Sequence, residues 1–513
     1  MKRAKREYES LRPGHFFLRV TLTVLKNLPA FLMALALACG RQETIAPPPA
    51  PKPASAPVSL PLVGFDSALP DHQTIGRVLR HGRQNLDPAS FARIRQLDQH
   101  ALQARGLRDI RPLASLTGLE SLWLQNNRIE NPAPLASLTN LTQLFLDQNR
   151  LTALSPLAKL SRLRYLGASQ NALTTMGGVE HLAALEYLNL SGNELSNLAP
   201  LAPLVRLTEL HLSDNRVTDL ASLNALRHLK RLSLDSNALA SLRGLEGCAA
   251  LEEVSLSATG INNLQPLARA SRLRKLNLVR NNIVDLAPIL APVAPLAHLA
   301  EIHLSDNRVT NLSPLRSFQN LKRLFLDRNP LATLDGLEGC VALEEVSLSD
   351  TGVASLQPLA RASRLRKLNL VRNDIADLSP LQDCAAMEEL EIDGNLVAAL
   401  APVAEMKELR ILNISNNRFD TLAPLAGLTR LESLRASHNS LGTLNGLQAS
   451  TSLRRLDLAH NAIRDLSSLG VLRELEELHL DENSVVNLAP LRAHTRLQVL
   501  RLKYNSVNDL SHL

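Results

Sequence analysis

Leucine recurs along most of this chain with a fixed spacing of 22 residues. From Leu119 the pattern L-x-x-L-x-L-x-x-N-x-I reads LESLWLQNNRI, and 22 residues later it reads LTQLFLDQNRL at 141–151. The L-x-L alternation is typical of a β-strand, in which successive side chains point to opposite faces. We therefore expect one short strand in each unit. Eighteen clear units follow one another, after a degenerate one at 97–113.

Two further positions predict the rest of each unit. Asn closes the pattern in sixteen units, and Thr259 and Thr351 stand there in the other two. An Asn side chain both donates and accepts hydrogen bonds, so it can satisfy backbone groups at the sharp bend after each strand. Pro recurs near the sixteenth position of many units, as at Pro134 and Pro156. Its fixed φ and missing N–H predict the start of a short helical turn there.

Part of the array is duplicated. The stretch LQPLARASRLRKLNLVRN occurs at 264–281 and again at 356–373, within two copies that span about 207–298 and 299–390. The offset of 92 residues is four units plus four extra residues near 291–294. Recombination between near-identical units explains this simply, because any whole number of coils still stacks. Selection for a long or repetitive ligand is the alternative, since linked contacts strengthen one another.

The pattern resembles the leucine-rich repeat, in particular the 22-residue subclass of the bacterial internalins and of eukaryotic phosphatase-regulating repeat proteins. The resemblance covers residues 97–513, about 19 units. It implies an α/β repeat solenoid, curved, with a parallel β-sheet on its concave face and short helical or 3-10 turns on its convex face. Physical reasoning agrees, because one coil cannot bury its leucines alone whereas stacked coils share a continuous core. Apolar residues at helical spacing in 63–96 predict an N-terminal helical cap.

The beginning of the chain resembles a bacterial export signal. Residues 1–38 are basic and then apolar, over too short a run to span a bilayer, and ALAC at 36–39 is similar to a lipobox. That resemblance implies acylation of Cys39, and Gly40 after it implies the outer membrane, with secretion as the alternative. The Pro- and Ala-rich residues 39–62 then form an extended tether. We predict an envelope lipoprotein that contacts the membrane only through its lipid anchor.

Charge argues against a nucleic-acid partner. The net charge is +7, of which residues 1–38 contribute +5 (seven Lys and Arg less two Glu), so +2 remains for the rest. The positions expected on the sheet carry both signs, and we see no basic groove. The sequence stops within a unit, at YNSVNDLSHL, so the last coil could leave an uncovered edge. From that edge we predict weak self-association.

No motif points to catalysis, a cofactor or a metal. Cys248, Cys340 and Cys384 take a position that elsewhere holds Leu, so we expect buried, unpaired thiols. His438, His460 and Glu482 share one position in consecutive units, but a straight ladder matches tetrahedral zinc coordination poorly. Asp457 and His479 form an adjacent acid–imidazole pair without a nucleophile or an enclosed pocket. We therefore predict no enzyme activity.

The strongest functional signal is aromatic. Aromatic residues make up 3% of the chain, yet four stand on sheet positions of four consecutive units. These candidate binding residues are Trp123, Phe145, Tyr165 and Tyr187, and Glu209 and His211 continue the row. Exposed aromatic clusters mark binding surfaces, although packing of Trp123 against the cap is an alternative. We predict a non-catalytic scaffold that binds a protein partner, or a glycan, on its concave face. A structural, self-associating envelope protein and an intracellular phosphatase-regulator-like protein are the rival interpretations.

Overall fold

The computed structural model describes residues 62, 64–80, 88–97, 100–292 and 297–511. The chain divides into two compact units, 1–58 and 59–513, and every described residue belongs to the second. The predicted signal peptide and Cys39 lie outside the described residues, as does nearly all of the tether. In the described part, no helix has both the length and the apolar character needed to cross a bilayer.

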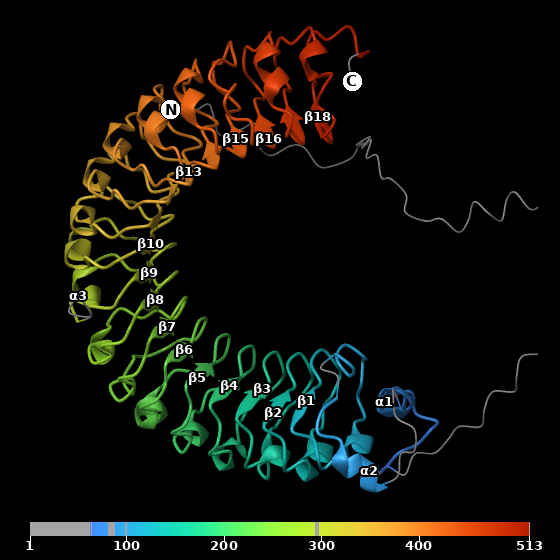
Figure 1. Cartoon of the computed structure of the whole chain (residues 1–513). Coiled ribbons are helices and arrows are strands. Elements are labelled where there is room, and N and C mark those ends of the chain that lie inside the picture. The colour runs from blue at the N-terminus through green and yellow to red at the C-terminus, as the bar shows by residue number, and fades with distance from the viewer. Residues whose placement is uncertain (1–61, 63, 81–87, 98–99, 293–296, 512–513) are drawn as a thin grey trace, which may run out of the picture. The chain divides into compact units, whose positions relative to one another are not determined.

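Eighteen strands of three residues each form one parallel sheet, and they pair in the order of the sequence. The sheet is curved and open, with the strands on its inner side and the helical turns on its outer side (Figure 1). The strands are β1 (Ser121–Trp123), β2 (Gln143–Phe145), β3 (Tyr165–Gly167), β4 (Tyr187–Asn189), β5 (Glu209–His211), β6 (Arg231–Ser233), β7 (Glu253–Ser255), β8 (Lys275–Asn277), β9 (Glu301–His303), β10 (Arg323–Phe325), β11 (Glu345–Ser347), β12 (Lys367–Asn369), β13 (Glu389–Glu391), β14 (Ile411–Asn413), β15 (Ser433–Arg435), β16 (Arg455–Asp457), β17 (Glu477–His479) and β18 (Val499–Arg501). The predicted solenoid with a parallel sheet is confirmed.

The convex side carries short 3-10 helices, most of which have Pro in their first two positions, as predicted. They are η1 (Arg111–Ser115), η2 (Ala133–Ser137), η3 (Ser155–Leu157), η4 (Val179–His181), η5 (Ala199–Leu201), η6 (Ala221–Ala225), η7 (Gln265–Leu267), η8 (Ser313–Ser317), η9 (Leu337–Gly339), η10 (Gln357–Leu359), η11 (Ser379–Leu381), η12 (Ala401–Glu405), η13 (Ala423–Gly427), η14 (Ser467–Val471) and η15 (Ala489–Leu491). The coil that is four residues longer has a turn of α-helix instead, α3 (Ala287–Leu290).

Leucines fill a single core, and an asparagine ladder runs beside it. The middle residue of nearly every strand is buried, so stacking removes each coil's apolar surface from water. In the first rung, Asn127 Nδ2 donates to the carbonyls of Leu102 (2.8 Å) and Leu124 (2.9 Å). Its Oδ1 accepts the N–H of Leu107 at 3.0 Å. Each Asn thus joins two coils, which is the role that its hydrogen-bonding capacity predicted.

The N-terminal cap is helical, as predicted, and it is attached to the first coil by polar contacts. It consists of α1 (Pro70–Arg80) and α2 (Pro88–Arg93), which bury Ile75, Leu79 and Phe91. Asp71 Oδ2 accepts the backbone N–H groups of Arg108 (2.8 Å) and Asp109 (2.9 Å). The Asp71 carboxylate therefore accepts these two hydrogen bonds in place of a preceding coil.

The three core cysteines should be nearly inert in the folded protein. Each is buried, and burial raises the pKa of the Cys248 and Cys340 thiols to about 12 and that of Cys384 to about 11. Because the thiolate is the reactive form, we expect alkylation by iodoacetamide at pH 8 to be more than about a hundredfold slower than in urea. Mass spectrometry of the three cysteine peptides measures this. Rapid modification of any of them in the native protein would contradict the packing.

Candidate binding surface

Two rows of side chains cover the concave face of the sheet. The first and third residues of each strand point away from the core and the middle one points into it, as the burial of β2 and β4 shows. We call these the first row and the third row. Successive residues of a row come from neighbouring strands, so they lie about 4.8 Å apart along the sheet. Side chains that stand 22 residues apart in the sequence are therefore neighbours on this face.

The structure brings the predicted aromatic residues together on β1 to β5. We call Trp123, Phe145, Tyr165, Tyr187 and His211 the aromatic cluster, and each is half-buried. The rings of Trp123 and Phe145 stack with centroids 6.4 Å apart and planes inclined by 13°. Tyr187 lies 6.4 Å from Tyr165 and 5.5 Å from His211, again between ring centroids. The cluster is therefore continuous over five strands except at one junction.

That junction is made by a glycine. Gly167 takes the third row of β3, next to Phe145, and a Cβ atom there would lie 2.8 Å from Phe145 Cδ1. Real Cβ atoms do not approach this closely, so Gly167 makes room for the phenyl ring and for the Asp147 carboxylate, whose Oδ2 would be 2.5 Å away. Burial raises the pKa of Tyr187 and lowers that of His211. Burial therefore favours the uncharged form of both rings.

The alternative for Trp123 was packing against the N-terminal cap. The cap helices α1 and α2 contact η1, on the convex side of the first coils. Trp123 lies on the opposite side of the sheet layer and stacks on Phe145. This placement favours an exposed binding role for Trp123, which remains a prediction.

Glu209 and His211 belong to an ionic cluster that occurs twice. On β5, His211 Nε2 lies 3.6 Å from Glu209, which also pairs with Arg231 on β6. The duplication places Glu301 and His303 at the matching positions of β9, as the sequence showed.

The second copy is more tightly built than the sequence revealed. Glu301 is 5% exposed and receives His303 Nε2 at 2.6 Å, Lys275 Nζ at 2.7 Å and the guanidinium of Arg323. Burial alone would raise the pKa of Glu301, but these three donors lower it to about 2. Phe325 stacks on His303 with ring centroids 4.4 Å apart. Sequence analysis missed this burial because it depends on three neighbours from three strands.

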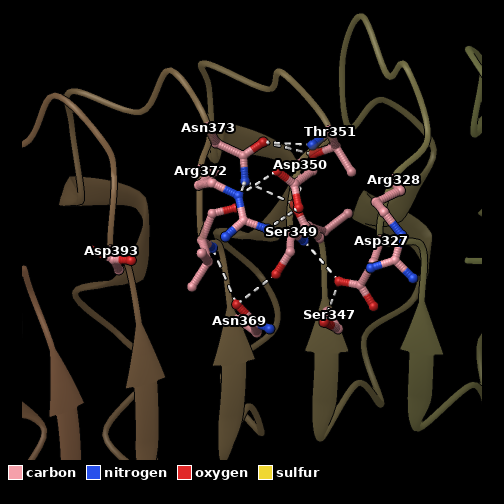
Figure 2. A network of polar contacts seen from close by, with 12 residues as sticks. Asp327, Arg328, Ser347, Ser349, Asp350, Thr351, Asn369, Arg372, Asn373 and Asp393 are labelled. Carbon is pink, nitrogen blue, oxygen red and sulfur yellow. Dashed lines mark hydrogen bonds and ion pairs between the residues drawn. The ribbon is translucent and has the colours of Figure 1, made fainter. Parts of the chain in front are cut away.

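Polar side chains beyond the strand ends bond to one another (Figure 2). Asp327 accepts the backbone N–H of Ser349 at 2.8 Å, and the Ser349 hydroxyl donates to Asn369 at 2.9 Å. Next to them, Arg372 Nε donates to Asp350 at 2.6 Å. Asp350 and Arg372 both have the left-handed backbone that follows nearly every strand. Many polar groups at this edge therefore bond to one another.

The two weaker candidate groups differ in their contacts. His438 and His460 stack with centroids 3.9 Å apart, and His460 Nδ1 lies 2.9 Å from Glu482. No group of three or more potential metal ligands occurs within the described ranges. Asp457 accepts the N–H of Ala459 at 3.1 Å, and neither a hydrogen bond nor an ion pair joins it to His479 in the described part of the chain.

Comparison with known proteins agrees with the fold. A family model described as "Leucine Rich repeats (2 copies)" matches residues 117–159, 205–247 and 297–339, and one described as "Leucine rich repeat" matches 139–195. A sequence search of curated proteins finds no significant match.

Many solved structures have a similar fold. A TDR receptor is 18% identical, with 82% of this chain and 86% of that chain covered and a TM-score of 0.55. The Arabidopsis receptor kinase HAESA, solved in complex with a peptide hormone, is 22% identical, with coverages of 78% and 72% and a TM-score of 0.52. An internalin of Listeria monocytogenes is 24% identical, with coverages of 64% and 84% and a TM-score of 0.46. At these identities the likeness is one of fold. The family models identify leucine-rich repeats at residues 117–195, 205–247 and 297–339.

Proposed function

We propose that this protein is a non-catalytic scaffold that binds a protein partner on its concave face. The observation that carries the proposal is the aromatic cluster, which gathers four of the chain's few aromatic residues on adjacent strands. Half-exposed Trp and Tyr side chains supply large contact areas at low entropic cost, and they dominate many protein interfaces. The proposal includes neither catalysis nor metal binding.

The framework around the cluster also suits recognition. The strands are locked by the asparagine ladder and by the leucine core, so the surface exists before a ligand arrives. A preformed surface loses little conformational freedom on binding, which favours affinity. The aromatic rings are followed by Glu209 and Arg231, which add polar contacts at the margin. This composition suits a protein better than a polyanion such as nucleic acid.

We expect loss of the cluster to weaken partner capture. The bait is residues 62–513 in a pull-down from envelope extract, compared with a Trp123→Ala, Tyr187→Ala variant checked for folding by circular dichroism. We expect the variant to bind the captured partner at least about tenfold more weakly, since each such anchor contributes 1–2 kcal/mol or more. Phe325→Ala, which removes a concave aromatic ring outside the cluster, is the matched control. Equal retention by the Trp123, Tyr187 variant would place the site elsewhere, and a glycan as the captured molecule would replace the protein partner.

We further propose that the protein is attached to a bacterial membrane through a lipid on Cys39. Support comes from the lipobox-like ALAC sequence and from the Pro- and Ala-rich segment after it, which can hold the repeats away from the bilayer. We expect wild-type cells fed radiolabelled palmitate to label the protein, and the Cys39→Ser variant to lose all of the label. Unlabelled wild-type protein would remove the anchor and favour the secreted or intracellular alternatives.

A further inference from the structure

A second feature of the concave face lies far along the array from the aromatic cluster. Strands β13 to β16 lie in the C-terminal half of the sheet (Figure 1). Their residues line a hollow of about 140 Å³ on the sheet surface. Its floor is Ser433, a short side chain in the first row, which is 5% exposed and stands between Ile411 and Arg455. Arg435 and Asn413 border it from the third row. The hollow exists because a serine follows an isoleucine and precedes an arginine in the same row.

Arg455 differs from the other basic residues of the first row, and Arg435 in the third row resembles it. Elsewhere a carboxylate on an adjacent strand neutralises each cation of the first row. These pairs are Arg231 with Glu209, Lys275 and Arg323 with Glu301, and Lys367 with Glu389. Neither Arg435 nor Arg455 has an ion pair within 4 Å among the described residues, although Asp457 and Glu477 follow them on the next strands. Both arginines line the hollow.

One acidic residue also faces the hollow, and it is already engaged. Glu391 accepts a hydrogen bond from Asn413 Nδ2 at 3.0 Å. Asn413 is in turn oriented by the N–H of Ser415, which its Oδ1 accepts at 3.2 Å. Two arginines and one glutamate leave the hollow with a net charge of +1. A ligand that carries a carboxylate beside an amide N–H would match both signs, with its N–H directed to Glu391.

We propose that Arg435 and Arg455 form a carboxylate-binding site for the partner protein. A guanidinium presents parallel N–H donors that match the two oxygens of a carboxylate, and two of them from neighbouring strands can hold one carboxylate between them. This site rests on the proposed function in one respect, because it assumes that a protein supplies the carboxylate. The carboxylate comes from a chain terminus or from an Asp or Glu side chain.

Small carboxylates test the site without knowledge of the partner. The Nε–Hε NMR signals of Arg435 and Arg455 in the full chain, assigned by Arg435→Gln and Arg455→Gln, are followed during titration. N-acetylglycine represents a chain terminus, N-acetyl-aspartate N-methylamide represents an acidic side chain, and N-acetylglycinamide is the neutral control. We expect saturable shifts of both signals with at least one acid, no shift with the amide, and at least about tenfold weaker binding in either variant. The acid that binds more tightly identifies the source of the carboxylate.

A matched control separates a site from general charge attraction. Arg418 is an exposed arginine outside the hollow, and Arg418→Gln should leave the titration unchanged. Absence of saturable shifts, or equal shifts at Arg418, would overturn the proposal. That result would leave the aromatic cluster and the binding function untouched, because neither depends on Arg435. Conversely, equal capture of a partner by the Trp123, Tyr187 variant would contradict the aromatic site and would not affect the carboxylate site.

Discussion

Replacing Asn237 by Ala should destabilise the array by about 3–5 kcal/mol, since each buried polar group left without a partner costs about 1–3 kcal/mol. Asn237 is 1% exposed, and its Nδ2 donates to the carbonyls of Leu212 (2.9 Å) and Leu234 (2.8 Å). Its Oδ1 accepts the N–H of Val217 at 2.9 Å. Alanine leaves the Leu234 carbonyl and the Val217 N–H buried and unpaired, whereas the Leu212 carbonyl keeps a hydrogen bond from Asn215 Nδ2 at 3.0 Å. Urea unfolding followed by circular dichroism measures the loss.

Because Asn237 lies in the interior of the array, the Asn237→Ala variant should also unfold in a different way from wild type. Each coil contacts only its neighbours, so a weak interface in the interior can separate the array into two cooperative blocks. Hydrogen exchange should accelerate first at residues 212–239. The matched control is Asn311→Ala, which removes one exposed hydrogen bond to the N–H of Ser313 and should cost less than about 1 kcal/mol. Equal losses in the two variants would contradict a special role for the ladder.

The fold could be predicted almost completely because its determinants are periodic. The 22-residue spacing of Leu, Asn and Pro places the strands, nearly all rungs and most of the convex turns, and all eighteen clear units have a strand. Neighbours on the sheet follow from the same spacing, so the aromatic cluster could be listed before its geometry was known. What periodicity does not show is how side chains of different lengths share the surface.

The missed features all depend on such local combinations. Glu301 is buried because Lys275, His303 and Arg323 converge on it, whereas Glu209 at the matching position lacks the lysine. The hollow exists because a short Ser433 lies between longer side chains. Both outcomes depend on three adjacent strands and on rotamers, and neither residue type alone signals them. In the sequence, only the duplicated Glu and His positions pointed to the Glu301 cluster. Duplication indicates repetition and does not indicate burial.

The buried carboxylate gives a test that separates charge from shape. Glu301→Gln keeps the size of the side chain but removes the charge that Lys275, His303 and Arg323 share. The folded pKa of Glu301 is about 2, against an ordinary value of 4.5. A lowered folded pKa contributes stability above the unfolded pKa, and this contribution is lost as pH falls from about 4.5 towards 2. We therefore expect the variant to be less stable than wild type by about 2–3 kcal/mol at pH 7, with the difference shrinking below pH 4.5.

Urea titrations at pH 7, 4 and 3 measure that difference, and the comparison with wild type cancels the titration of other carboxyl groups. Glu345→Gln is the matched control, because Glu345 lies in the same row two strands further and has no ion pair among the described residues. We expect it to change stability by less than about 0.5 kcal/mol at each pH. A pH-independent loss in Glu301→Gln would mean that packing, rather than charge, stabilises this cluster. The same result would imply that carboxylates do not neutralise the paired cations of the concave face. The contrast with the unpaired Arg435 and Arg455 would then lose its basis.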